Sequence, residues 1–184
     1  PDSVGGRNLT YPPNTTYPGQ GLAGENVELI TGGIGNAVLF KKGVADGTIT
    51  VLATDHAPHP RESKHTDFAS ASFGIVGLDC ALPLYARALI EDGVIDWPVM
   101  IKLMTINPAR LVGLDRRGLG SLKVGGPGDV TVIDPEMEWT IKAAEFMSVG
   151  RNCPFDGWNV KGRAVATIVG GKVKLTRVTE RVAV

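Results

Sequence analysis

The residues best suited to chemistry lie in one short segment, "TDHAPH", at positions 54–59. It contains Asp55, His56 and His59, and the third histidine of the chain is His65. A carboxylate can bind a divalent metal ion and accept a proton from water, and neutral imidazole is a common ligand of zinc. Metal sites normally need three or four ligands, so a second interpretation stays open. In that interpretation Asp55 caps a turn, and His56 and His59 are surface residues.

The segment before this loop, "GTITVLATD" at positions 47–55, must position Asp55. It is a short apolar run rich in β-branched residues, which is typical of a strand buried on both faces in a parallel sheet. Side chains at the carboxyl end of such a strand project into the crevice where these folds keep their sites. The pattern therefore predicts a parallel strand that ends at Asp55.

Two helical patterns follow, over residues 77–93 and 96–114. In the first, Pro83 is expected to cause a kink or to mark the true first turn. In the second, Asp96 is the expected N-cap, and Pro108 marks the place where the helix must stop or restart. A strand followed by helices predicts an α/β unit.

The chain divides into three regions by composition. Residues 1–42 are rich in Gly and Pro and are expected to be an irregular leader. Residues 43–117 carry the strand, the His-containing loop and the helices. Residues 118–184 alternate between polar and apolar positions around Gly turns, and the Gly170–Gly171 pair indicates a hairpin. This last region predicts a small antiparallel sheet or sandwich.

The overall composition excludes several classes of protein. Among 184 residues, 19 basic side chains balance 19 acidic ones, so no global charge would attract nucleic acid or a membrane surface. No apolar run approaches the ~18 residues of a membrane span, and no secretory signal is visible. Cys80 and Cys153 are too few for a disulfide scaffold, so a cytoplasmic protein is expected. Pro1 is not a natural first residue, so the chain is expected to be trimmed or to be a fragment.

Several motifs, taken in order, carry a resemblance to a known family. These are "GTITVLATDHAPHP", "FGIVGLDCALPL", "NPARLVGL", "GSLKVGGPGDVTVIDP" and "CPFDGWNVKGRAVATIVGGKV". Together they resemble the C-terminal part of dihydroorotases of the longer, hydantoinase-like type in the amidohydrolase superfamily. The likeness covers roughly residues 43–175. It implies an α/β fold: the C-terminal part of a metal-dependent (β/α)8 barrel, with a small β-sandwich subdomain.

The resemblance also implies a reaction and residue roles. The enzymes of this family reversibly cyclise N-carbamoyl-L-aspartate to dihydroorotate in pyrimidine biosynthesis, with one or two zinc ions. Asp55 matches a metal ligand that is also the catalytic proton shuttle, and His59 matches a residue that binds the substrate carboxylate. Phe73 and Gly74 match the loop whose backbone meets the substrate ring, although Ser72 stands where proline is expected. His56 is expected to be structural.

The chain also departs from the family pattern. The family's H-x-H pair of metal ligands has no counterpart, because every histidine lies between positions 56 and 65. Most metal ligands are therefore expected outside this chain, which we expect to be inactive alone and homo-oligomeric only at full length. Two alternatives stay open: a non-catalytic scaffold whose partner is aspartate transcarbamoylase, and another cyclic amidohydrolase such as a hydantoinase or allantoinase. No nucleic-acid or membrane partner is expected.

Overall fold

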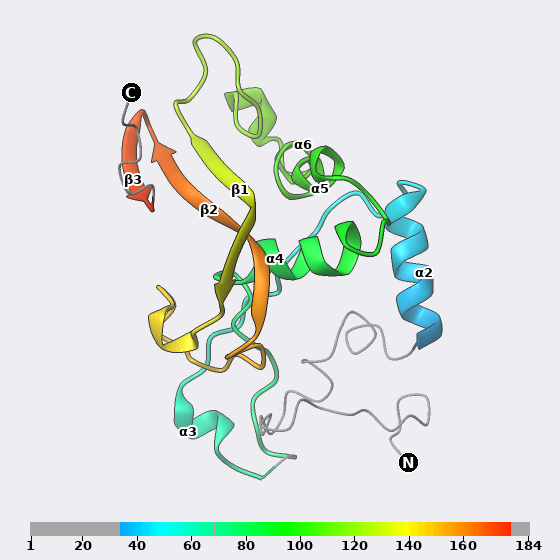
Figure 1. Ribbon diagram of the computed structural model, residues 1–184, viewed down its shortest axis with the longest axis vertical. Coiled ribbons are helices and arrows are strands. Elements are labelled where there is room, and N and C mark those ends of the chain that lie inside the picture. Colours follow the sequence, from blue (N-terminus) through cyan, green and yellow to red (C-terminus); the bar gives the residue numbers. More distant parts are fainter. Residues whose placement is uncertain (1–33, 68, 178–184) are drawn as a thin grey trace.

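The computed structural model describes residues 34–67 and 69–177, so the predicted leader up to residue 33 lies outside the described residues. Helices fill the first half of this part, and an antiparallel sheet fills the second (Figure 1). The helices are α2 (Ile34–Ala45), α3 (Arg61–Lys64), α4 (Ala81–Tyr85), the π-helix η1 (Ala86–Ile90), α5 (Trp97–Met104), α6 (Ile106–Leu111), and the 3-10 helices η2 (Leu114–Arg117) and η3 (Ala143–Glu145). The strands are β1 (Val130–Thr140), β2 (Asn159–Val169) and β3 (Lys172–Thr176).

Helix α2 differs from the expectation for this region. Residues 34–42 belong to the stretch predicted to be irregular, yet they form most of the helix. Its sequence contains Ala, Leu and Lys, which favour helix, and its C-terminal end buries Val44 in a hydrophobic cluster that Phe40 partly joins. Packing of this end stabilises a segment whose neighbouring glycines made the local composition resemble a loop.

The segment predicted as a parallel strand, residues 47–55, is not a strand in the described structure. Among the described residues, the only parallel strand-like pairing near this segment is one isolated bridge, between His56 and Ile75. The prediction of burial on both faces was also wrong, because Leu52 is buried whereas Ala53 and Asp55 are exposed. A parallel strand needs neighbouring strands on which to form hydrogen bonds, and no named strand pairs with this segment.

Helices hold this segment instead. The backbone N–H of Leu52 donates to the carbonyl of Leu103 in α5 at 3.0 Å, and the hydroxyl of Tyr85 donates to the carbonyl of Ala53 at 2.6 Å. Leu52 also packs in the same hydrophobic cluster as Leu89 and Met100. The segment is therefore fixed as an extended arm against α4, η1 and α5.

The expected helix boundaries hold where local signals set them. Pro83 lies in the first turn of α4, where the missing N–H costs nothing. Asp96 caps α5 by accepting a hydrogen bond of 2.9 Å from the N–H of Val99. Helix α5 ends before Thr105, and Pro108 lies in the first turn of α6, so the helix restarts there.

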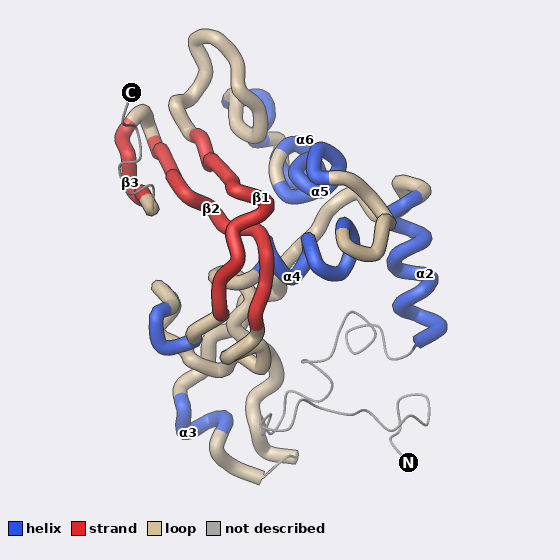
Figure 2. Tube along the Cα trace, in the orientation of Figure 1, coloured by secondary structure: helices blue, strands red, loops and turns tan. Residues whose placement is uncertain are grey.

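The C-terminal region forms a three-stranded antiparallel sheet in the order β1–β2–β3 (Figure 2). Gly170 and Gly171, both with positive φ, connect β2 to β3 as the sequence predicted. Helices α4 and η1 contact β2, which joins the helical half to the sheet. A second hydrophobic cluster lies at this junction and includes Val76, Cys80, Ile141 and Cys153.

None of the helices in the described part of the chain has the length and apolar character needed to span a bilayer.

Candidate active site

Asp55 lies at the end of the extended arm and has an unusual backbone conformation. Its φ is +45°, and it is the only residue other than glycine with positive φ in the described part of the chain. Left-handed backbone costs an L-residue about 1–2 kcal/mol, and Asp tolerates it better than most because its short side chain bonds locally. The carboxylate is exposed, so it is accessible to a ligand. Strained backbone of this kind clusters at functional sites.

His56 connects this loop to the loop around Gly77. Its Nδ1 accepts hydrogen bonds from the backbone N–H groups of Gly77 and Leu78, at 3.2 and 3.1 Å. Since Nδ1 is an acceptor, the ring proton lies on Nε2. The parallel bridge to Ile75 is formed by the same residue. These contacts agree with the structural role expected for His56.

His59 is half-buried, and its backbone is held by Asn152. Its N–H donates to Oδ1 of Asn152 at 3.1 Å. The same side chain donates through Nδ2 to the carbonyls of Ala57 at 2.9 Å and Gly74 at 3.1 Å. Asn152 is only 5% exposed. One buried amide therefore joins the loop that carries His59 to the loop that carries Gly74.

Gly74 lies against Ala57 and His59 where the two loops meet, a place we call the loop junction. Its φ is +108°, and a Cβ built on it would lie 2.4 Å from Cβ of Ala57 and 3.5 Å from Nε2 of His59. Only glycine allows this approach, because a methyl group there would overlap Ala57. The imidazole of His59 thus lies beside the backbone of the loop predicted to meet a substrate ring. Phe73, in contrast, is 79% exposed.

Lys64 holds the same loop from helix α3. Its Nζ donates to the carbonyls of Ser72 at 2.6 Å and Gly74 at 2.7 Å. The residue is 3% exposed, and burial lowers the pKa of its ammonium group below the ordinary range. No ion pair among the described residues involves Lys64. Two charge-assisted hydrogen bonds to carbonyls therefore offset the cost of its burial.

Sequence reasoning missed Lys64 and Asn152. Lys64 lies in the charged stretch "RESKHTD", which is typical of a solvated surface. Asn152 precedes "CPFDGW", and the signal that could have identified it is a polar amide beside apolar Cys153 and Pro154. Their partners are carbonyl groups in other segments, and one of these contacts spans 95 residues. Sequence spacing carries no direct record of such contacts.

The described residues do not by themselves fit a metal ion. Within residues 34–67 and 69–177, no group of three or more histidine, cysteine, aspartate or glutamate side chains could hold one. Asp55 supplies a single carboxylate, and a closed site needs more ligands than that. A metal site that uses Asp55 would need donors from elsewhere.

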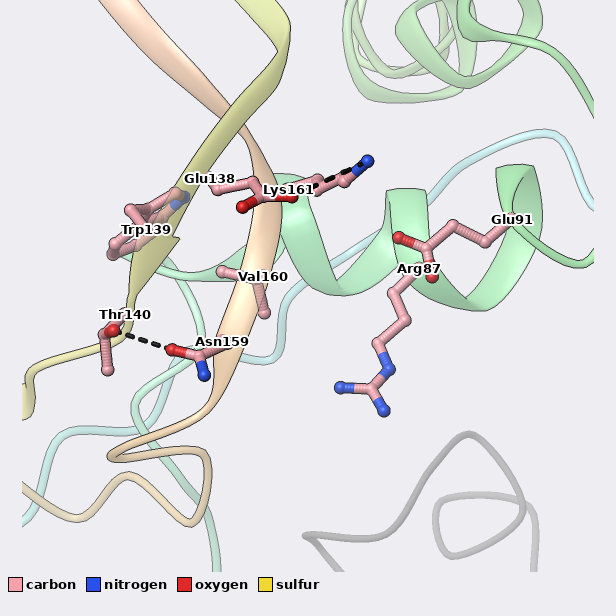
Figure 3. Close-up of a pocket in the computed structure, with 8 residues that line it drawn as sticks. All are labelled: Arg87, Glu91, Glu138, Trp139, Thr140, Asn159, Val160 and Lys161. Carbon is pink, nitrogen blue, oxygen red and sulfur yellow. Dashed lines mark hydrogen bonds and ion pairs between the residues drawn. The ribbon is translucent and has the colours of Figure 1, made fainter.

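A separate pocket of about 590 Å³ lies between η1 and the faces of β1 and β2 (Figure 3). The charges of its lining are mixed: Arg87 and Lys161 are basic, and Glu91 and Glu138 are acidic. None of the predicted site residues lines it.

A family model for the amidohydrolase family matches residues 36–174, about three quarters of the chain. The chain belongs to the amidohydrolase family. The match includes the loops that carry Asp55, His59, Gly74 and Asn152, so the junction described above lies inside the family domain.

Individual relatives agree with this assignment. The chain is 53% identical over 134 residues to a protein named dihydroorotase from Geobacter sp. (strain M21), and 50% identical over 134 residues to one from Citrifermentans bemidjiense. Each alignment covers 73% of this chain and 31% of the relative. The likeness to dihydroorotases expected from the motifs is therefore confirmed, and the chain spans about a third of the length of these relatives.

Solved structures give a consistent result. The chain is similar to the L-hydantoinase (dihydropyrimidinase) from Arthrobacter aurescens, with a TM-score of 0.73 and 28% identity, covering 79% of this chain and 33% of that one. It is also similar to a D-hydantoinase from Thermus sp., with a TM-score of 0.68 and 25% identity, covering 76% and 31%. The predicted α/β class is confirmed.

Proposed function

We propose that this amidohydrolase chain is the C-terminal portion of a dihydroorotase, which reversibly cyclises N-carbamoyl-L-aspartate to dihydroorotate. The observation that carries the proposal is identity of about half, over 134 residues, to proteins named dihydroorotase. The loop junction gives it a structural basis, because His59 and Gly74 lie together beside the end of the Asp55 arm. The reaction belongs to pyrimidine biosynthesis, which suits a cytoplasmic protein.

Each site residue has a proposed task. In the hydrolytic direction, water adds to the ring carbonyl carbon, the carbon–nitrogen bond breaks, and the nitrogen gains a proton. Asp55 takes the proton from water and returns it to the nitrogen, and its exposed position leaves it free to reach both. His59 binds the substrate carboxylate, and the backbone near Phe73 and Gly74 meets the ring.

The proposed cofactor is zinc, as one or two ions, with Asp55 as one ligand. The other ligands would come from the parts of the relatives that this chain does not span. Zinc lowers the pKa of a bound water and polarises a carbonyl.

The proposed architecture follows the same relatives. Residues 47–55 would become the last strand of a (β/α)8 barrel when a neighbouring strand is present, and the β1–β2–β3 sheet would form part of a β-sandwich. The extended arm and the parallel bridge at His56 support the first assignment. A homo-oligomeric state at full length belongs to the same proposal, whereas aspartate transcarbamoylase is the partner in the scaffold alternative.

A second candidate is hydrolysis of a hydantoin or a dihydropyrimidine. It is supported by the similarity in fold to the L-hydantoinase from Arthrobacter aurescens, with a TM-score of 0.73. Sequence identity to that protein is lower than to the dihydroorotases, at 28% against 53%, so dihydroorotate is the preferred substrate.

A chimeric enzyme tests the proposal. The matching 134 residues of the Geobacter sp. (strain M21) dihydroorotase would be replaced by those of this chain. We expect the chimera to bind metal and to cyclise N-carbamoyl-L-aspartate. Cyclisation should be lost in Asp55→Asn and strongly weakened in His59→Asn. His65→Asn is the matched control, because His65 is exposed and is expected to keep full activity.

Three other results would contradict the proposal. Hydrolysis of hydantoin without cyclisation of carbamoyl-aspartate would favour the second candidate. A folded, metal-loaded chimera without either activity that binds aspartate transcarbamoylase would favour the scaffold. Full activity of Asp55→Asn would remove the proposed proton shuttle.

A further inference from the structure

Two donors from distant parts of the chain converge on one carbonyl oxygen. Lys64 Nζ lies 2.7 Å from the oxygen of Gly74, and Asn152 Nδ2 lies 3.1 Å from the same atom. A carbonyl oxygen has two lone pairs, and here each is matched by one of these donors. The orientation of the peptide after Gly74 is therefore fixed from two sides.

Asn152 uses both ends of its amide at this point. Its Nδ2 group donates to two carbonyls, and its Oδ1 accepts the N–H of His59. A buried amide with this pattern can adopt only one orientation. If it were flipped, its NH2 group would face the N–H of His59 and its oxygen would face two carbonyl oxygens. The backbone carbonyl of Asn152 also accepts from the N–H of Val76 at 3.0 Å. Asn152 is therefore bonded to both loops.

Lys64 carries a cost that its hydrogen bonds must offset. A buried ammonium group loses hydration, and the described ion pairs give it no carboxylate in exchange. Its two short bonds run to carbonyls of the Ser72–Gly74 segment, and the N–H of Ser72 donates back to the carbonyl of Ser63 in α3. Helix α3 directly follows the His59 loop, so Lys64 ties the two loops together independently of Asn152.

We infer that Lys64 and Asn152 are positioning residues that lock the His59 loop and the Gly74 loop into one rigid substrate-binding edge. The inference rests on the proposed function for the identity of the substrate, but the lock itself is independent of that function. The imidazole Nε2 of His59 and the backbone of Gly74 lie together only while this lock holds. Loss of either donor should disturb the binding of an anionic ring substrate more than the chemical step.

Amide hydrogen exchange on the 184-residue chain tests the lock without any need for activity. In Asn152→Ala, the N–H of His59 loses its acceptor, so we expect its protection to disappear. In Asn152→Asp, an acceptor for the N–H of His59 remains, but the donor becomes an oxygen that faces the carbonyls of Ala57 and Gly74, so protection at His59 should fall less than in Asn152→Ala. The amide of Met100, bonded to Asp96 in α5, should be unchanged in both variants.

Lys64→Met tests the second donor, with Lys142→Met as its matched control. Lys142 is exposed and pairs with Glu145, so its loss should change no loop amide. Lys64→Met should speed exchange at Ser72, whose amide bonds to Ser63 within the same junction. Unchanged exchange at His59 in Asn152→Ala and at Ser72 in Lys64→Met would overturn the lock.

Kinetics of the chimeric enzyme test the effect on substrate. Asn152→Ala and Lys64→Met should each raise KM about tenfold while kcat changes by less than about threefold, because positioning acts on binding. Lys64→Arg keeps a donor cation and should recover part of the KM. If the two residues were purely structural, the variants would yield less folded enzyme, and the enzyme that does fold would have a normal KM. That result would overturn the inference. An inactive parent chimera would overturn the proposed function, while the exchange result would still decide the lock.

Discussion

The side-chain oxygen of Asn152 accepts a 3.1 Å hydrogen bond from the backbone N–H of His59, 93 residues earlier in the chain. This contact brings the C-terminal half of the chain, which also contributes the sheet, to the loop that carries the candidate site. Gly150 reinforces it, since a Cβ there would lie 2.8 Å from Cβ of Pro58. The site is therefore assembled by the fold of both halves rather than by the "TDHAPH" segment alone.

Replacement of Gly74 by alanine should be strongly destabilising. The new methyl group would lie 2.4 Å from Cβ of Ala57, and the residue has φ of +108°. Backbone strain and overlap together are expected to lower the free energy of unfolding by about 2–4 kcal/mol. Urea denaturation monitored by circular dichroism measures the change.

Gly47→Ala is the matched control for this prediction. Gly47 also has positive φ, at +81°, but nothing lies within 4 Å of a Cβ built on it. Only the backbone cost remains, about 1–2 kcal/mol. Equal effects of the two substitutions would show that close packing against Ala57 contributes nothing.

Substitutions of Asp55 should reveal the strain in its backbone. Glycine adopts φ of +45° without steric cost, so Asp55→Gly should raise the free energy of unfolding by up to about 1 kcal/mol. Asn shares the tolerance of Asp for this conformation, so Asp55→Asn should be nearly neutral, and Asp55→Ala should be the least stable of the three. The measurement is chemical denaturation of all three variants. Finding Asp55→Ala as stable as Asp55→Gly would show that the backbone is relaxed.

Local signals predicted the helix boundaries between residues 77 and 114, although α2 and α3 were not predicted. The Asp96 cap, the position of Pro83 and the restart of the helix at Pro108 all depend on residues within one turn of the boundary. The Gly170–Gly171 hairpin is equally local. In each case the residue type sets the backbone conformation at its own position, so the sequence pattern is sufficient.

The remaining features depend on contacts that are distant in sequence. Residues 47–55 have the composition of a strand, but a parallel strand forms only beside a neighbouring strand. Here the segment forms hydrogen bonds to Leu103 in α5 and to Tyr85 in α4 instead. The sequence did not reveal Lys64 and Asn152 for the same reason, because their roles come from hydrogen bonds to carbonyls in other loops. Asp55 and His59 were singled out from residue type, and their catalytic roles stay predictions.

The two cysteines should be unreactive in the folded chain. Cys80 and Cys153 both have no exposed surface, and Sγ of Cys80 donates to the carbonyls of Val76 and Gly77. The neighbouring Cys153 thiol and burial raise the pKa of Cys80, whereas the same pairing lowers the pKa of Cys153. Because neither residue is exposed to solvent, Ellman's reagent reaches the sulfur atoms only when the chain opens, so modification should require unfolding and be at least about 100-fold slower than in urea. Cys80→Ala and Cys153→Ala assign any reaction to one thiol. Rapid modification of either thiol under native conditions would contradict this packing.

Stability at alkaline pH should report on Lys64. Burial lowers its pKa in the folded chain below the ordinary value of 10.5, whereas the unfolded chain keeps the ordinary value. Between these two values the unfolded chain binds more protons, so the contribution of Lys64 to the free energy of unfolding rises with pH. Below the folded pKa both states are protonated, and the contribution is constant.

The measurement is urea denaturation from neutral pH to about 10.5 for the parent, Lys64→Met and Lys142→Met. The parent should gain stability relative to Lys64→Met as pH rises, since deprotonation removes the cost of a buried charge while a neutral amine can still donate to the carbonyls of Ser72 and Gly74. Lys142→Met should follow the parent, because Lys142 is exposed. A difference between parent and Lys64→Met that stays flat with pH would mean that Lys64 is solvated, and the lock on the Gly74 carbonyl would then lose one of its two donors. A difference that falls with pH would mean that the bonds to the carbonyls favour the charged ammonium more than burial disfavours it.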